Sequence, residues 1–451
     1  MKLPQKFRFV LKGIACFLSI WLFLGFYNAA PLHALSDFNS NELSYTANTD
    51  TLLAQSYSTP CLASADWVNK PNPPSEIPGN PKTQTFCQFY QFSWQWFLYL
   101  MSPSASDPSL RNFQDAKNYP ILQVTGDSCS SNATEPVFFI RTVKDLKDAG
   151  EFVLPERINQ AGDAATIYAQ NDNVVFYSVR FGRDLCTASN QGNLPTDTTE
   201  IKMAWKTIEE AEKANYISID ADVIPETGTP VKETLGLVGY HLVRGTPEHP
   251  ELIWSSYEHK SNAPNCLKPS AAPANGWSFL SESCSQCLSS PNQSCFDSCK
   301  YNAAQKATSL TTDTPSEICR IFPEGTAPGD NKGEENITDV DTLNQQLVGP
   351  GGILTSLPAN NPMAVMANYF NIGALWVNDT SQPANPDNQR GGLRLENPTM
   401  ETTYQGTLTF NGSMIEASTQ NGRNCFSCHI YTPNKTATSK LSHIFDNIHG
   451  Q

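Results

Sequence analysis

The pattern of apolar and polar positions divides the chain into segments with different periods. An aromatic-rich apolar run from Phe86 to Leu100 is dense and long enough to predict a largely buried helix. From about residue 135 to 260, short runs in which apolar and polar residues partly alternate are typical of strands. The predicted strands are Pro136–Val143, Asn173–Arg180, Glu200–Trp205, Tyr216–Val223, Lys232–Val243 and Leu252–Tyr257. Brief helices are predicted at Pro155–Gln160 and Thr207–Lys213. Because several connections look short and polar, we expect antiparallel pairing in a sandwich or an open sheet.

Helical signals return in the last quarter of the chain. Asn361-Pro362 precedes a predicted helix at Met363–Val377, and Asn397-Pro398 precedes a predicted helix that carries Met400. An asparagine cap followed by proline in the first turn is a common helix start. These patterns predict an α+β fold with an antiparallel β-rich central region and a helical C-terminal region.

The chain begins with a basic stretch followed by an apolar run at Gly13–Phe26 and then by small residues. The run has the length of a signal-peptide core and is short for a membrane span. We expect residues 1–34 to be a signal peptide that is cleaved after Ala34; the alternative is an uncleaved membrane anchor. No second apolar run of this kind follows. We therefore expect no stable membrane span after cleavage, and export to the periplasm or an equivalent compartment.

The cysteines fit export. Of thirteen cysteines, Cys16 lies in the signal segment and two belong to a motif near the C-terminus, which leaves ten for up to five disulfides. Pairs at Cys61 and Cys87 and at Cys129 and Cys186 could each close one loop. Six more cysteines crowd into one stretch: Cys266, Cys284, Cys287, Cys295, Cys299 and Cys319. A disulfide-stapled insertion is favoured there, with zinc ligation or a redox pair as alternatives.

The motif near the C-terminus is Cys425-Phe426-Ser427-Cys428-His429, which has the Cys-x-x-Cys-His spacing of c-type haem attachment. Two thiols three positions apart can form thioethers with the two vinyl groups of one haem, and the adjacent histidine can then ligate the iron. The motif occurs once, so one covalent haem c is expected. A Cys425–Cys428 disulfide and a zinc site are the alternatives. Only 22 residues follow His429 (451 − 429), so the haem must belong to the larger fold.

A second axial ligand would be a histidine nitrogen or a methionine sulfur. Met400 and His443 are the leading candidates for this distal position. His259 ranks behind them, because a hydrogen-bonded structural role is the simpler interpretation of that residue. An open sixth position is also possible and would favour ligand binding or peroxide chemistry.

Several segments resemble an uncharacterised family of exported bacterial mono-haem c-type cytochromes. The resemblance is carried by Trp94–Leu100, Glu200–Lys206, His249–His259, Asn397–Thr402 and the haem motif. It covers islands spread over most of the chain after residue 34, and it implies an exported haem protein with a large non-haem portion. The cysteine-rich stretch departs from this pattern.

The predicted domains are 35–260, with the aromatic helix and the β-rich region; 261–340, the cysteine-rich insertion; and 341–451, the helical haem-binding region. The formal net charge of −14 becomes −18 (−14 − 4) after removal of residues 1–34. Such an acidic protein is poorly suited to nucleic acid and could attract a redox partner with a basic face. Electron transfer is the leading hypothesis. A haem enzyme or small-ligand sensor, and a β-rich binding protein with an accessory haem, are the alternatives, so enzymatic activity stays undecided.

Overall fold

The computed structural model describes most of one compact unit, Thr59–Gln451. The described residues are 61–122, 127–130, 137–139, 166–188, 194–224, 229, 231–303, 314–326, 334–418, 425–433 and 440–449. The predicted signal peptide at 1–34 and the predicted helix at Pro155–Gln160 lie outside them. Within the described ranges, no helix combines the length and the apolar composition that crossing a membrane requires.

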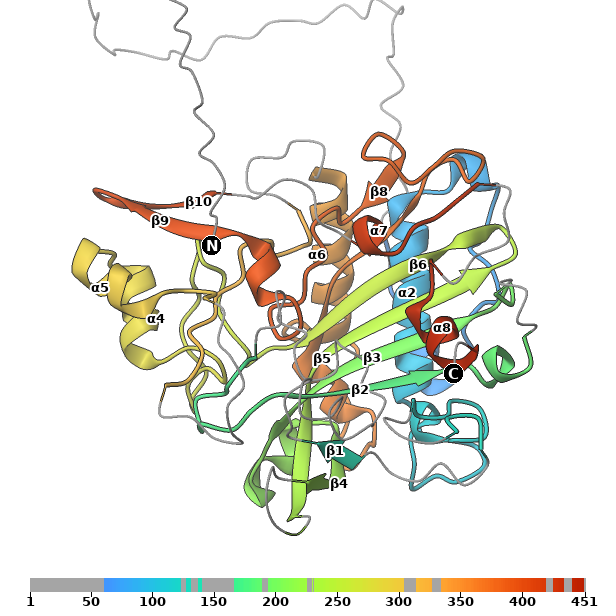
Figure 1. Cartoon of the computed structure of the whole chain (residues 1–451), viewed down its shortest axis with the longest axis horizontal. Helices are drawn as coiled ribbons and strands as arrows, with labels where there is room; N and C mark the ends of the chain where they lie inside the picture. The colour runs from blue at the N-terminus through green and yellow to red at the C-terminus, as the bar shows by residue number, and fades with distance from the viewer. Residues whose placement is uncertain are drawn as a thin grey trace, which may run out of the picture. The chain divides into compact units, whose positions relative to one another are not determined.

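An eight-stranded sheet is the centre of this unit (Figure 1). Six of its strands follow one another in antiparallel order: β2 (Phe176–Phe181), β3 (Thr199–Thr207), β5 (Val231–Thr246), β6 (His249–His259), β7 (Tyr369–Val377) and β8 (Gln389–Gly391). β4 (Ser218–Ile224) pairs antiparallel with the first part of β5, and β1 (Val137–Phe139) pairs parallel with β4. Each of the six predicted strands overlaps an observed strand, so the antiparallel β-rich region is confirmed.

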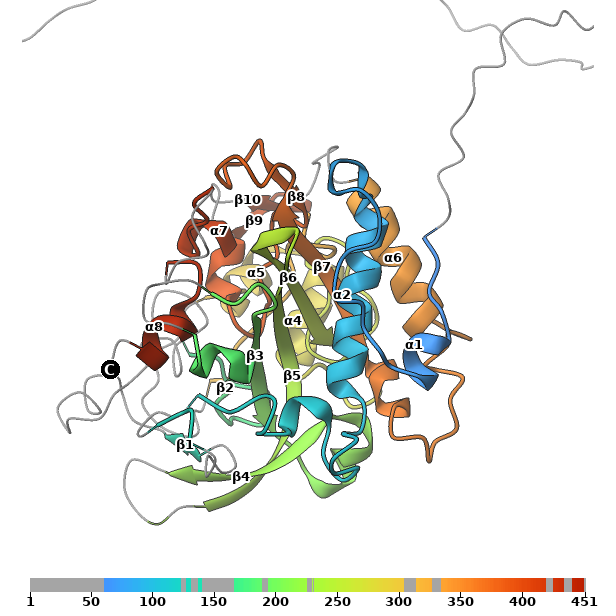
Figure 2. The same cartoon turned by 90° about the vertical axis from the view of Figure 1, so that its right-hand side faces the viewer.

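The predicted aromatic helix is confirmed as α2 (Phe86–Met101). It begins with a capping box, in which the Thr85 hydroxyl accepts from the Gln88 amide and the Gln88 side chain accepts from the Thr85 amide. Figure 2 shows α2 beside α6 (Glu334–Val348) on one face of the sheet. There the ring of Phe97 stacks on Tyr257 of β6, with centroids 3.8 Å apart. We call this side of the sheet the first face.

The prediction of a helix at Met363–Val377 is wrong. The segment is a short 3-10 helix, η6 (Ala364–Asn368), followed by the interior strand β7. Trp376 of β7 packs in the core of the first face, whereas Leu375 and Val377 pack on the opposite face. A strand buried on both faces is apolar at every position, and such a run has no strand period that would distinguish it from a buried helix.

The helix predicted after Asn397-Pro398 is also not an α-helix. Asn397 folds the chain into a turn, because its side-chain oxygen accepts from the Thr399 amide at 3.0 Å. The next helical turn is the 3-10 helix η7 (Thr402–Gln405), and it ends at Gly406, whose φ of 110° does not continue a helix. The prediction of a helical region at 341–451 therefore needs correction, since the described part mixes strands with short helices.

The remaining elements are short. They are α1 (Asp66–Asn69), η1 (Pro81–Thr83), η2 (Asn112–Gln114), η3 (Arg183–Cys186), η4 (Glu210–Asn215), α4 (Glu282–Ser289), α5 (Gln293–Cys299), the hairpin β9 (Thr407–Asn411) and β10 (Met414–Ser418), α7 (Cys425–Cys428) and α8 (His443–His449). η4 corresponds to the brief helix predicted at Thr207–Lys213, shifted toward its C-terminus.

Five disulfides staple the unit. The expected pairs Cys61–Cys87 and Cys129–Cys186 are confirmed. The cysteine-rich stretch contains the pairs Cys266–Cys319, Cys284–Cys299 and Cys287–Cys295, the last two of which join α4 to α5. This confirms the interpretation of that stretch as disulfide-stapled.

Candidate functional site

The Cys-x-x-Cys-His motif forms α7 and the residue after it. The His429 amide donates to the Cys425 carbonyl at 2.8 Å, so Cys425, Cys428 and His429 occupy positions i, i+3 and i+4 of one helical turn. Cys425 is half-buried and Cys428 is exposed, and both are free thiols. Every other cysteine in the described ranges is in a disulfide. The two motif thiols are thus in the reduced state that thioether formation needs.

The imidazole of His429 is oriented by two contacts. Its Nδ1 lies 2.9 Å from the Leu441 carbonyl oxygen, which can only accept, so the proton is on Nδ1 and the lone pair is on Nε2. This arrangement, with one nitrogen donating to a carbonyl and the other directed to a metal, is usual for metal-binding histidines. The ring also packs against Trp254 of β6 at 4.4 Å between centroids. Trp254 lies on the face of the sheet opposite α2, which we call the second face.

The structure brings one of the two candidate distal ligands to the motif. The rings of His443 and His429 are stacked, with centroids 4.4 Å apart and planes 24° apart. Met400 is fully buried in a different apolar cluster, with Val238, Phe279 and Ile318. Of the two, only His443 therefore lies against His429.

Four hydrogen bonds hold the segment that carries His443. The Ile430 amide donates to the Lys440 carbonyl at 2.9 Å, and Leu441 accepts from His429 as described above. The Ser442 hydroxyl donates to the Glu200 carboxylate of β3, and it accepts from the Phe445 amide at 3.0 Å. The segment is thus attached both to the motif and to the sheet.

His259 is a hydrogen-bonded structural residue, in agreement with the simpler interpretation of the sequence. Its Nε2 donates to the Asn215 carbonyl at 2.9 Å, and its Nδ1 accepts from the Ser261 hydroxyl at 2.7 Å. Its ring stacks on Tyr216 at 4.1 Å between centroids. Burial lowers the pKa of this imidazole to about 3, so it is neutral at physiological pH.

Sequence reasoning missed a group of charged residues on the second face. Glu200 and Lys202 of β3 face this side, and Lys202 lies directly opposite His241 of β5. The His241 Nε2 atom is 3.0 Å from the Glu401 carboxylate. The signal was present in Glu200 and Lys202, which are charged residues two positions apart in an otherwise apolar strand.

These charges influence the motif. The pKa of the Cys425 thiol is raised, first by burial and then by the carboxylates of Glu401 and Glu396, while Lys202 opposes the shift. Burial also raises the pKa of Glu200 and of Glu396 to about 7 each. Titratable carboxyl groups therefore lie near the motif, on the segments that position it.

A second group of sulfur atoms is a candidate for metal binding. The Sγ atoms of Cys287, Cys295 and Cys299 all lie within 4.8 Å of one another. Each of them is in a disulfide, and a disulfide sulfur lacks the thiolate charge that ligates zinc. In the state described, this group staples α4 to α5.

Comparison with family models, with curated proteins and with solved structures finds no match for this chain. The function of the site is therefore argued from its own residues.

Proposed function

We propose that Cys425 and Cys428 attach one haem c covalently and that His429 is its proximal iron ligand. The observation that carries this proposal is the state of the cysteines: ten are paired, and the two motif thiols are left free beside a histidine with its lone pair on Nε2. A c-type haem needs two thiols and one such imidazole at this spacing. The alternative of a Cys425–Cys428 disulfide has no support in the structure.

In the stacked arrangement the His429 and His443 rings are too close for a haem to lie between them, so ligation by both would require the His443 ring to move away from His429. His443 lies against His429 on a segment fastened by Ser442 and Leu441, whereas Met400 is buried among apolar side chains of another cluster. We therefore propose His443 as the distal ligand. When bound, a haem with two histidine ligands supplies an iron that changes between the ferric and the ferrous state. The chain contributes the orientation of the His429 imidazole and the apolar wall formed by Trp254 and Phe426.

The role that fits these features best is electron transfer outside the cytoplasm. Five disulfides are typical of an oxidising compartment, in agreement with the predicted signal peptide and with the periplasm as its destination. Cys428 is exposed, so the motif borders solvent at that position and is accessible to a partner. The net charge of −14 favours a redox partner with a basic face.

The test is to express the full chain together with a haem-attachment system in an oxidising compartment. Haem that stays with the polypeptide after denaturation, with the spectrum of a c-type haem in the reduced state, supports the proposal. The Cys425→Ser/Cys428→Ser variant should lose it. The Cys61→Ser/Cys87→Ser variant is the matched control and should keep it. A wild-type protein without covalent haem contradicts the proposal.

Carbon monoxide distinguishes the distal ligands. If His443 ligates the iron, the reduced wild type should not change its spectrum with carbon monoxide, and His443→Ala should. Met400→Leu should behave like the wild type. His449→Gln is the second control, since His449 bonds the Leu185 carbonyl at 2.7 Å and has no proposed role. Carbon monoxide binding by the wild type would instead favour a haem enzyme or a small-ligand sensor.

A further inference from the structure

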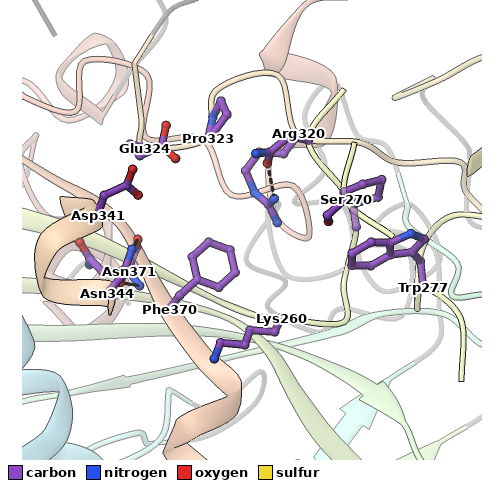
Figure 3. Close-up of a pocket in the computed structure, with 13 residues that line it drawn as sticks. Lys260, Ser270, Trp277, Arg320, Pro323, Glu324, Asp341, Asn344, Phe370 and Asn371 are labelled. Atoms are coloured by element: carbon purple, nitrogen blue, oxygen red, sulfur yellow. Dashed lines mark hydrogen bonds between the residues drawn. The ribbon is translucent and has the colours of Figure 1, made fainter. Parts of the chain in front are cut away.

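A pocket of about 220 Å³ lies between α6, the start of β7 and the cysteine-rich stretch. In Figure 3, Glu324 and Asp341 lie at one end with their carboxyl groups directed toward each other. The ring of Phe370 lies in the middle, and Arg320 and Trp277 lie toward the other end. This volume is below the usual range of drug-sized ligand sites and suits a small molecule.

Within the described residues, the carboxyl groups are not directly paired with a cation, although the charges of Arg320 and Lys268 act to lower the pKa of Glu324. Neither Glu324 nor Asp341 forms an ion pair with any described residue. The pKa of Glu324 is raised to about 7, first by burial and then by the charge of Asp341, and burial also raises the pKa of Asp341. A cation bound between the two carboxyl groups would favour their ionised forms and lower both pKa values.

The two basic side chains of the pocket are occupied elsewhere. The Arg320 guanidinium forms a bidentate pair with the fully buried Glu258, and its third hydrogen bond goes to Asn265 at 2.8 Å. The Lys260 ammonium donates to the Val348 carbonyl at the end of α6. Arg320 and Lys260 therefore direct their hydrogen bonds away from the acidic end, although the charge of Arg320 still acts on Glu324.

A second kind of observation also indicates a ligand. Trp277 lines the pocket and is only 7% exposed, yet its indole N–H has no hydrogen-bond partner within the described part of the chain. The side-chain oxygen of Asn371, which lines the acidic end and is 1% exposed, also accepts no hydrogen bond there. A buried polar atom without a partner costs about 1–3 kcal/mol. A ligand that donates a hydrogen bond would relieve this cost at the Asn371 oxygen, whereas the Trp277 N–H would need an acceptor.

We propose that this pocket binds a small organic cation with a primary ammonium group. The ammonium donates to Glu324, Asp341 and the Asn371 oxygen, while the apolar part of the molecule packs on Phe370 and Trp277. A bare divalent cation fits less well, because only two carboxyl groups line a pocket that also has an aromatic wall, and calcium takes six to eight oxygen ligands. This proposal does not depend on the haem.

The experiment is calorimetric titration of the full-length protein with butylamine as the probe and butanol as its neutral analogue. We expect saturable binding of butylamine and none of butanol at the same concentrations. Glu324→Gln and Asp341→Asn should each weaken butylamine binding at least tenfold. Asp297→Asn removes an exposed carboxylate on α5 and should leave it unchanged.

Circular dichroism shows whether each variant is folded. If Glu324→Gln does not fold, Asp341→Asn, which changes a residue on the surface of α6, still tests the proposal. The proposal is overturned by equal binding of butanol, by the absence of saturable butylamine binding, or by two folded variants that bind like the wild type. Calcium chloride that binds more tightly than butylamine and displaces it would also overturn the proposal and identify a metal site.

Discussion

One buried histidine should make an unfavourable contribution to folding in acid. His259 is 4% exposed, and both of its ring nitrogens are engaged in the neutral form, one as a donor and one as an acceptor. A proton on Nδ1 would replace the lone pair that accepts from Ser261. Burial is the largest cause of the low pKa, which falls from its ordinary value of 6.5 to about 3.

The magnitude follows from proton linkage. Between pH 6.5 and about 3 the unfolded chain binds one proton at His259 that the folded protein does not bind. The free energy of unfolding therefore falls as the pH falls, by up to about 1.4 kcal/mol for each pH unit and by about 5 kcal/mol over the whole window. Above pH 6.5 both states are unprotonated at this position, so the contribution no longer changes with pH.

The perturbation is His259→Gln, whose amide can donate to the Asn215 carbonyl and accept from Ser261 but does not titrate. The variant loses the stacked ring and should be less stable at pH 7. The free energy of unfolding of the variant should nevertheless depend less on pH. The quantity to compare between the two proteins is the slope of this free energy against pH. Urea unfolding at intervals from pH 4 to 7 gives the free energy for both proteins.

Buried carboxyl groups do not obscure this comparison. Glu200 and Glu396 have a pKa raised to about 7, so protonation favours the folded state between about pH 4.5 and 7, which is the opposite sign. These two carboxyl groups contribute equally to the pH dependence of wild type and variant. The difference between the two slopes therefore gives the contribution of His259. His449→Gln should keep the wild-type slope. If His259→Gln and the wild type have the same slope below pH 6, the reasoning is refuted.

Three further predictions concern stability at neutral pH. Gly239→Ala should cost about 1–3 kcal/mol in urea unfolding, because the added Cβ would lie 2.2 Å from the Thr399 hydroxyl oxygen in a tightly packed region; an unchanged midpoint would contradict this. The Cys61→Ser/Cys87→Ser variant should lose about 3–4 kcal/mol from a loop with a sequence separation of 26, and the loss should vanish when wild type and variant are compared in reductant. Arg320→Met should cost about 3–5 kcal/mol, since it leaves a fully buried carboxylate unpaired, and an equally stable variant would show that the pair is dispensable.

The sequence predicted the parts of the fold whose signals are local. The density of aromatic residues predicts α2, and partial alternation predicts the strands, because a strand with one apolar and one polar face has a period of two residues. The sequence allows the pairs Cys61–Cys87 and Cys129–Cys186, and the structure contains both. The haem motif was identified by its spacing alone.

The remainder depends on contacts between segments far apart in the chain. β7 was predicted as a helix because its burial on both faces removes the strand period. Met400 and His443 were equal candidates for the distal iron ligand, because no pattern in the sequence indicates what each side chain packs against. The pair formed by His241 and Glu401 joins residues 160 positions apart, and no local pattern indicates it.

One strand explains why the motif belongs to the larger fold. β6 presents Tyr257 to the first face, where it stacks on Phe97 of α2, and Trp254 to the second face, where it packs against His429. It also binds the Asn397 turn, whose amide donates to the Tyr257 carbonyl at 3.0 Å. α2, the Asn397 turn and the haem motif are therefore linked through β6, although they are scattered along the chain. A substitution that displaces β6 should thus disturb the proposed haem site and the aromatic core together, which a haem module appended to an independent domain would not do.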